Sequence, residues 1–259
     1  MQNENPTTAR FPTAFSIIEL LVVIGVMAIL AAILLPVLAR ARLAAQEQVC
    51  VVRCRELGGL LAVYAGEHED RFPAAIDDGP ETARDPNLWD NYTFQVFSTF
   101  AREPWHEWAG LGNQSEVLYC SANQDLPYNE PWVCNPDFVL SASVYAESAY
   151  FAPDIPEHAW RLRLGAKVQT HSAAVFPSQK VGVLEHIVWH GWPGTSCIGC
   201  SVDGLFYYDS PRPGAVWFLD GHAGMHRARD ALPHVRRYPI WPYMPFGTTE
   251  HGIAGRDVP

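Results

Sequence analysis

The chain has 259 residues, with 18 Lys and Arg against 28 Asp and Glu and a net charge of −10. An acidic chain whose arginines are scattered lacks the basic surface that neutralises phosphates, so we expect no nucleic acid partner. The hydrophobic content of 48% is enough for a globular core. The 21 Pro, 19 Gly and many aromatic residues favour short strands and structured loops over a helical bundle.

An uncharged apolar run marks the N-terminal part of the chain. It extends from Leu20 to Ala39, and Glu19 stands directly before it. Twenty helical residues span about 30 Å, the thickness of the hydrocarbon core of a bilayer. The run exceeds the apolar core of about 7–15 residues that is usual in a cleaved signal peptide. We therefore predict a helix that lies in a membrane.

The helical pattern continues beyond the apolar run. Residues 39–48 contain no Gly or Pro, and apolar residues then recur at near-helical spacing at Val49, Val52, Leu57, Leu60, Leu61 and Tyr64. This predicts one helix from Ser16 to Tyr64, amphipathic in its second half. Pro36 lies inside it and is expected to produce a kink.

The segment from Phe15 to Ile24 closely resembles the cleavage and methylation segment of type IV prepilins and pseudopilins. The resemblance implies that a prepilin peptidase cuts between Ala14 and Phe15 and that the new amino group of Phe15 is methylated. It also implies that the Glu19 carboxylate pairs with the N-terminus of a neighbouring subunit inside an apolar filament core. Pro36 falls where many such pilins carry a helix-kinking proline.

Two features of the N-terminal segment differ from the family pattern. The family has Gly before the cleavage site, where this chain has Ala14. The family leader is usually basic, whereas the leader of this chain has one basic residue, Arg10, and one acidic residue, Glu4. By the positive-inside rule, Arg40 and Arg42 at the far end of the apolar run would favour an orientation with the N-terminus outside. The family arrangement places the N-terminus inside, with a single pass through the inner membrane and a periplasmic or extracellular C-terminal part.

Later segments resemble a subgroup of large pseudopilin-like proteins that is abundant in planctomycetes. The matching stretches are Cys50 to Ala65, Asp70 to Pro73, Val117 to Ser121 (expected as a short strand), Ser178 to Glu185, and Ala215 to His222 with its Asp-Gly-His signature. The residues themselves predict strands at Val181–Trp189 and Ala215–Leu219, the latter closed by an Asp-Gly turn. Residues 66–116 and 121–140 are predicted to be long and irregular.

The resemblance implies an α+β, pilin-like fold, in which a long kinked N-terminal helix packs on a small antiparallel sheet with long loop insertions. The expected divisions are a leader at 1–14, a transmembrane or filament-core helix at 15–39, its amphipathic continuation at 40–65 and a globular domain at 66–259.

Six cysteines follow the apolar run, an even number that suggests disulfides in an exported domain and metal ligands or thiols in a cytosolic one. The resemblance implies a disulfide between Cys50 and Cys120. Cys54 lies one helical turn from Cys50, where the two Cβ atoms are about 5–6 Å apart, beyond the roughly 3.5–4.5 Å that a disulfide needs. That leaves Cys54 as a thiol or paired with Cys134, and Cys197 with Cys200 as a local pair or as thiols.

Other polar residues suggest sites of lower specificity. Cys197 and Cys200 have zinc-ligand spacing, with His186 and His190 shortly before them. The acidic turns at Asp203, Asp209 and Asp220 would suit calcium, with Asp220 the best placed ligand; no other cofactor is expected. The ten His fall in no recognised catalytic pattern, so an enzyme is not expected. The tryptophans Trp105, Trp108, Trp132, Trp189 and Trp192 would form a sugar-binding surface or pack in the core.

These features together predict a structural subunit of a pseudopilus, a pilus-like filament or a type II secretion-like machine. Its expected partners are other pilin or pseudopilin subunits, the prepilin peptidase and the inner membrane. The alternative is a membrane-anchored periplasmic or surface binding module that does not polymerise.

Overall fold

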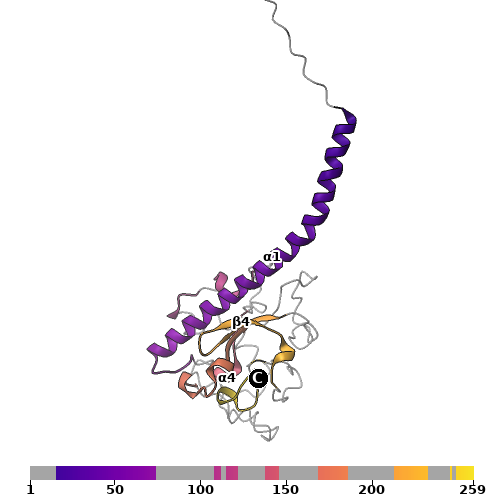
Figure 1. Ribbon diagram of the computed structural model, residues 1–259. Helices are drawn as coiled ribbons and strands as arrows, with labels where there is room; N and C mark the ends of the chain where they lie inside the picture. Colours follow the sequence, from indigo (N-terminus) through magenta and orange to yellow (C-terminus); the bar gives the residue numbers. More distant parts are fainter. Residues whose placement is uncertain are drawn as a thin grey trace, which may run out of the picture. The chain divides into compact units, whose positions relative to one another are not determined.

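A computed structural model describes residues 16–73, 108–111, 115–121, 138–145, 169–185, 213–232, 246 and 249–259. The chain divides into two compact units, Met1–Ala44 and Ala45–Pro259, and each is considered by itself. Helix α1 (Ile17–Glu67) begins in the first unit and ends in the second (Figure 1). The predicted long N-terminal helix is therefore confirmed. Pro36 lies within α1, and helical structure continues on both sides of it.

A small antiparallel sheet forms the centre of the second unit. Its strands are β1 (Phe138–Leu140), β2 (Val181–Glu185), β3 (Gly214–Phe218) and β4 (Ala223–His226), and they lie side by side in that order. β2 and β3 are buried at every residue, whereas β4 is half-buried. Strands buried on both faces read as continuous apolar runs, which explains why β2 and β3 could be predicted from the sequence. The α+β class is confirmed.

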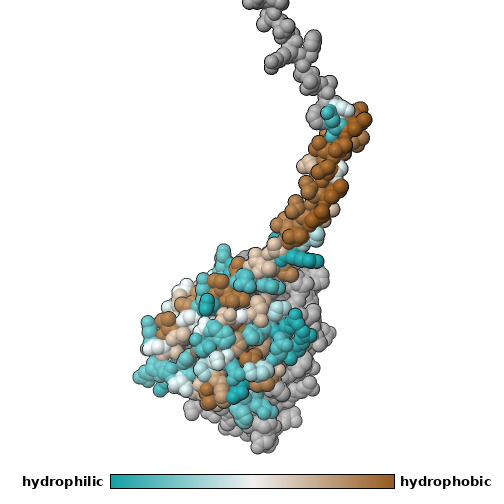
Figure 2. Space-filling view, in the orientation of Figure 1, coloured by the Kyte–Doolittle hydropathy of each residue, from teal (hydrophilic) through white to brown (hydrophobic). Residues whose placement is uncertain are grey.

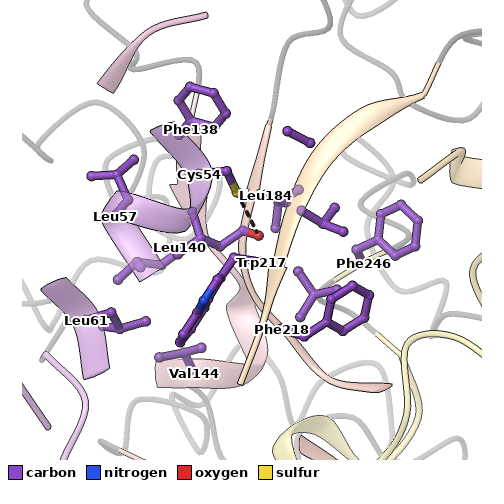
Figure 3. Close-up of a cluster of buried hydrophobic side chains, with 14 of the residues drawn as sticks. Cys54, Leu57, Leu61, Phe138, Leu140, Val144, Leu184, Trp217, Phe218 and Phe246 are labelled. Atoms are coloured by element: carbon purple, nitrogen blue, oxygen red, sulfur yellow. Dashed lines mark hydrogen bonds between the residues drawn. The ribbon is translucent and has the colours of Figure 1, made fainter. Parts of the chain in front are cut away.

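The second half of α1 packs against this sheet through one stripe of residues. Buried positions recur three and four residues apart at Cys50, Cys54, Leu57, Leu61 and Ala65, as expected for one face of a helix. Gly58 lies on the same stripe, where a Cβ atom would stand 2.1 Å from the ring of Trp217 on β3. The glycine therefore lets the helix approach the indole closely (Figure 3).

A buried ion pair ties the C-terminal segment to the start of β2. The Lys180 ammonium lies 2.9 Å from the Asp257 carboxylate, and both side chains are fully buried. The second carboxylate oxygen of Asp257 accepts the Val181 N–H at 2.8 Å. The Thr249 hydroxyl accepts from the Lys180 ammonium at 3.1 Å and donates to the Asp257 carboxylate. Burial lowers the pKa of Lys180, while Asp257 opposes that shift. These contacts make residues 249–259 an integral part of the fold.

Two local predictions are wrong. Residues 117–121 were expected as a short strand, but the 3₁₀ helix η2 (Glu116–Leu118) satisfies their backbone locally, with Leu118 N–H bonded to Ser115 and Tyr119 N–H bonded to Glu116. β1 lies inside a stretch that was expected to be irregular.

Short helices complete the described structure. They are α4 (Ala142–Tyr145) and the 3₁₀ helices η4 (His171–Ala173), η5 (Pro177–Gln179), η6 (Ala228–Asp230) and η7 (Gly252–Ala254). The end of α1 is joined to η4 by backbone hydrogen bonds from Phe72 N–H to Gln169 and from His171 N–H to Asp70.

Candidate functional site

The start of α1 is fixed by a reciprocal cap in which Glu19 takes part. The Ser16 backbone N–H donates to the Glu19 carboxylate at 2.9 Å, and the Ser16 hydroxyl oxygen accepts the Ile18 N–H at 3.3 Å. This is the arrangement of a capping box, Ser-x-x-Glu, which satisfies backbone donors that have no partner inside the helix. The sequence itself carries this signal in Ser16 and Glu19, three residues apart at the start of the apolar run.

The first unit carries an uninterrupted apolar surface. The large hydrophobic side chains from Ile17 to Leu38 are between 47% and 77% exposed, and Figure 2 shows them as a continuous hydrophobic band along the helix. In the part of the chain that the structure describes, α1 is the one helix long and apolar enough to cross a membrane. An apolar surface of this extent is unfavourable in water. The predicted cleavage residues Ala14 and Phe15 lie outside the described residues.

The second unit contains a buried cluster of thiols beneath the helix. The sulfur atoms of Cys50 and Cys120 are 2.8 Å apart, and both residues are fully buried. A disulfide bond measures about 2.05 Å. The structure therefore brings together the two cysteines for which a disulfide was predicted, without the bond itself.

The segment that carries Cys120 is attached to α1 by polar contacts on both sides of the sulfur pair. The Arg53 guanidinium donates to the Tyr119 carbonyl at 2.8 Å and lies 3.2 Å from the Glu116 carboxylate. The Ser121 N–H donates to the Cys50 sulfur at 3.3 Å, and the Ser121 hydroxyl donates to the Gln46 carbonyl at 3.0 Å. These bonds position Cys120 opposite Cys50.

Cys54 is a third buried thiol on the same face of α1. It is fully buried, and its sulfur is 3.7 Å from the Val183 carbonyl of β2, the contact drawn as a dashed line in Figure 3. Burial is the main cause that raises the pKa of Cys54, and the nearby Glu185 and Cys50 raise it further. The Cys54 side chain is therefore held in its protonated form.

Glu185 places a buried carboxylate beside the thiols. One of its oxygens accepts the Ala215 N–H at 2.8 Å. Ligand atoms of Cys50, Cys120 and Glu185 all lie within 4.8 Å of one another. Thiolate and carboxylate groups are ligands of zinc and similar cations. Among the residues that the structure describes, these three lie close enough together to bind one metal ion.

The Asp-Gly turn between β3 and β4 holds the residue for which calcium was predicted. The Asp220 carboxylate accepts the His222 N–H at 3.1 Å and lies 2.5 Å from Nδ1 of the same residue. The His222 ring stacks on Phe218 with ring centroids 4.2 Å apart. Gly221 has φ +97, which a residue with a side chain rarely adopts. The predicted turn is thus present, and the Asp220 carboxylate orients an exposed imidazole.

Several predicted ligands lie outside the described residues. They are His186, His190, Cys197 and Cys200 of the suggested zinc site, Asp203 and Asp209 of the calcium site, Cys134, and the tryptophans Trp105, Trp132, Trp189 and Trp192. Trp108 is described, and it contacts the rings of Tyr64 and His68 edge-on near the end of α1.

Comparison with known proteins identifies no relative: no protein-family model, no curated protein and no solved structure matches this chain.

Proposed function

We propose that this protein is a structural subunit of a pseudopilus, a pilus-like filament or a type II secretion-like machine, made from a precursor that is cut between Ala14 and Phe15. The observation that carries the proposal is the exposed apolar surface of α1 from Ile17 to Leu38, with the carboxylate of Glu19 at its N-terminal edge. A helix of this kind is stable in a bilayer before assembly and against the helices of other subunits after it.

Glu19 supplies the specificity of the proposed assembly. In a low-dielectric filament core a lone carboxylate is costly, whereas a carboxylate paired with a positive N-terminus is favoured over either charge alone. The pair would form only when neighbouring helices are in the correct register. In the single chain the same carboxylate accepts the Ser16 N–H, so assembly would exchange a local cap for a contact between subunits.

The proposal is tested by separating the charge of Glu19 from its role as a cap. Glu19→Gln keeps an oxygen that accepts the Ser16 N–H but removes the charge, so we expect normal insertion and folding with at least a tenfold loss of incorporation into filaments. Ser16→Ala is the matched control, because it removes the hydroxyl half of the cap and keeps the charge. The measurement is the amount of each variant in the sheared filament fraction relative to the membrane fraction. Normal incorporation of Glu19→Gln would contradict the proposed pairing.

The mass of the intact protein extracted from the membrane tests processing. We expect loss of residues 1–14 and the addition of one methyl group on Phe15, and we expect Ala14→Gly to speed the cleavage. A chain that keeps Met1 and remains monomeric in its native membrane would instead support the alternative, a membrane-anchored binding module.

A further inference from the structure

The buried thiol cluster is not explained by filament assembly. Cys50, Cys54 and Cys120 come from two segments about 70 residues apart, and all three are fully buried. The 2.8 Å separation of the Cys50 and Cys120 sulfurs is shorter than ordinary van der Waals contact between two sulfur atoms. This separation places the two sulfurs within reach of a covalent bond.

We propose that Cys50 and Cys120 become joined by a buried disulfide in an oxidising compartment, and that Cys54 is kept beside this bond as an unreactive thiol so that the bond cannot rearrange. Closing the sulfur pair from 2.8 Å to about 2.05 Å needs a movement of less than 1 Å. The hydrogen bonds of Arg53 and Ser121 already hold the two segments together. The inference requires export but not filament assembly.

The bond must form while the chain folds. The thiolate of one cysteine attacks a reactive disulfide of a thiol oxidase or oxidised glutathione, and the second cysteine then displaces that partner from the mixed disulfide. Two protons leave the cysteines, and two electrons reduce the oxidant to two thiols. Both sulfurs are fully buried in the folded chain, so neither an oxidant nor a reductant reaches them after folding is complete.

Cys54 is placed where rearrangement would otherwise start. It follows Cys50 by one turn of α1, so these two cysteines cannot bond to each other, whereas an attack by its thiolate on the Cys120 sulfur would release Cys50. The contact of its sulfur with the Val183 carbonyl turns it toward β2. Its burial and the adjacent Glu185 carboxylate disfavour the thiolate that such an attack requires. The carboxylate thus has a use in the cluster, since it keeps Cys54 protonated.

A metal centre formed by Cys50, Cys120 and Glu185 is the competing use of the same residues. Two thiolates on a tetrahedral zinc ion, each at about 2.3 Å, stand about 3.8 Å apart. Metal binding would therefore need the sulfur pair to open by about 1 Å, more than the disulfide needs it to close. The distance of 2.8 Å favours the covalent bond.

Peptide mapping of the full-length protein decides between these outcomes. The exported chain is denatured in an alkylating reagent without reductant and digested with trypsin, which cuts after Arg53 and so separates Cys50 (residues 43–53) from Cys54 (residues 54–55). Trypsin does not cut between Cys120 and Cys134, so a second protease that cuts before aspartate, here before Asp125, separates these two cysteines. We expect the Cys50 and Cys120 peptides as one reducible species and Cys54 fully alkylated. In the native protein we expect no alkylation of Cys54 and no reduction of the bond by dithiothreitol until denaturant is added.

The variants provide a matched pair. Cys54→Ser should keep the cross-link, whereas Cys120→Ser should lose it and lower the melting temperature by on the order of 10 °C, because the bond closes a loop of about 70 residues. Should Cys120→Ser fail to fold, the map of the unaltered chain still decides. Recovery of Cys50 and Cys120 as alkylated peptides, with or without stoichiometric zinc in the native protein, would overturn the proposal. Cys50 bonded to any other cysteine would overturn it as well.

Discussion

The two halves of α1 meet different surroundings although they belong to one helix. From Ile17 to Leu38, large apolar side chains point to all sides and are exposed. From Ala45 to Glu67, burial is confined to one stripe that includes Leu57, Gly58 and Leu61. The comparison teaches that apolar content and apolar spacing carry separate information. Continuous apolar sequence indicates a helix that needs an apolar environment on every side, whereas apolar residues three and four apart indicate a helix that packs on one partner.

The exposed surfaces of the two halves of α1 also differ in charge. The first half has no charge between Leu20 and Ala39, whereas the second carries Arg55, Glu56 and Glu67 on its exposed surface. Changes within the second unit should therefore alter the stability of the globular fold, and changes in the first half of α1 should not. Four predictions test this contrast, all measured by urea or thermal unfolding of the full chain in detergent.

The largest effect is expected from Asp257→Ala. This change leaves the fully buried ammonium of Lys180 without its carboxylate, and breaking a buried ion pair in this way costs about 3–5 kcal/mol. Asp230→Ala, at an exposed carboxylate, is the control and should change stability by less than about 0.5 kcal/mol. A loss below about 1 kcal/mol for Asp257→Ala would show that the C-terminal segment is not required for the fold.

Leu61→Ala should destabilise the globular unit by about 2–5 kcal/mol, because it leaves a cavity between α1 and the sheet at a residue that is fully buried. Leu38→Ala makes the same chemical change in the first half of α1, where the side chain is 67% exposed. The unfolding midpoint of the globular unit should not move for Leu38→Ala. Equal losses for the two variants would remove the distinction between the halves.

Gly58→Ala should destabilise by about 1–3 kcal/mol despite the higher helix propensity of alanine, because the added methyl group would overlap the Trp217 ring. Gly59→Ala is the adjacent control, with no atom within 4 Å of the added carbon. It should stabilise the helix by about 0.5–1 kcal/mol. Opposite signs at two consecutive glycines would locate the sheet-facing side of α1 to one residue; stabilisation by both would show that the helix does not approach Trp217.

The smallest effect is expected from the titration of His226. Burial lowers the pKa of His226, and His222 lowers it further, while Asp230 acts in the opposite direction. Because the pKa of His226 is lower in the folded chain, the unfolded chain binds the proton first as the pH falls. The contribution of His226 to stability is therefore present above a pH of about 6.5 and is lost as the pH falls through the lower folded pKa. His226→Gln should flatten the dependence of stability on pH between 7 and 5. His251→Gln, at an exposed imidazole, should retain the slope of the unaltered protein, and a steeper slope for His226→Gln would contradict the assignment.

The sequence by itself determined the features that depend on neighbouring residues. The extent of α1, the apolar run with Glu19 at its edge, and the turn at Asp220 and Gly221 follow from helix periodicity and from glycine chemistry, which act over a few residues. The strands β2 and β3 were recognisable because burial on both faces leaves an uninterrupted apolar run.

Tertiary structure alone decided the features that join distant segments. Glu116–Leu118 form a 3₁₀ helix where a strand was expected, and Ala223–His226 form a strand, because the backbone partners lie locally in the first case and on β3 in the second. The closeness of Gly58 to Trp217 and the burial of Lys180 with Asp257 join residues 159 and 77 positions apart. No local propensity encodes such contacts, since they form only when the sheet places both partners against the same core.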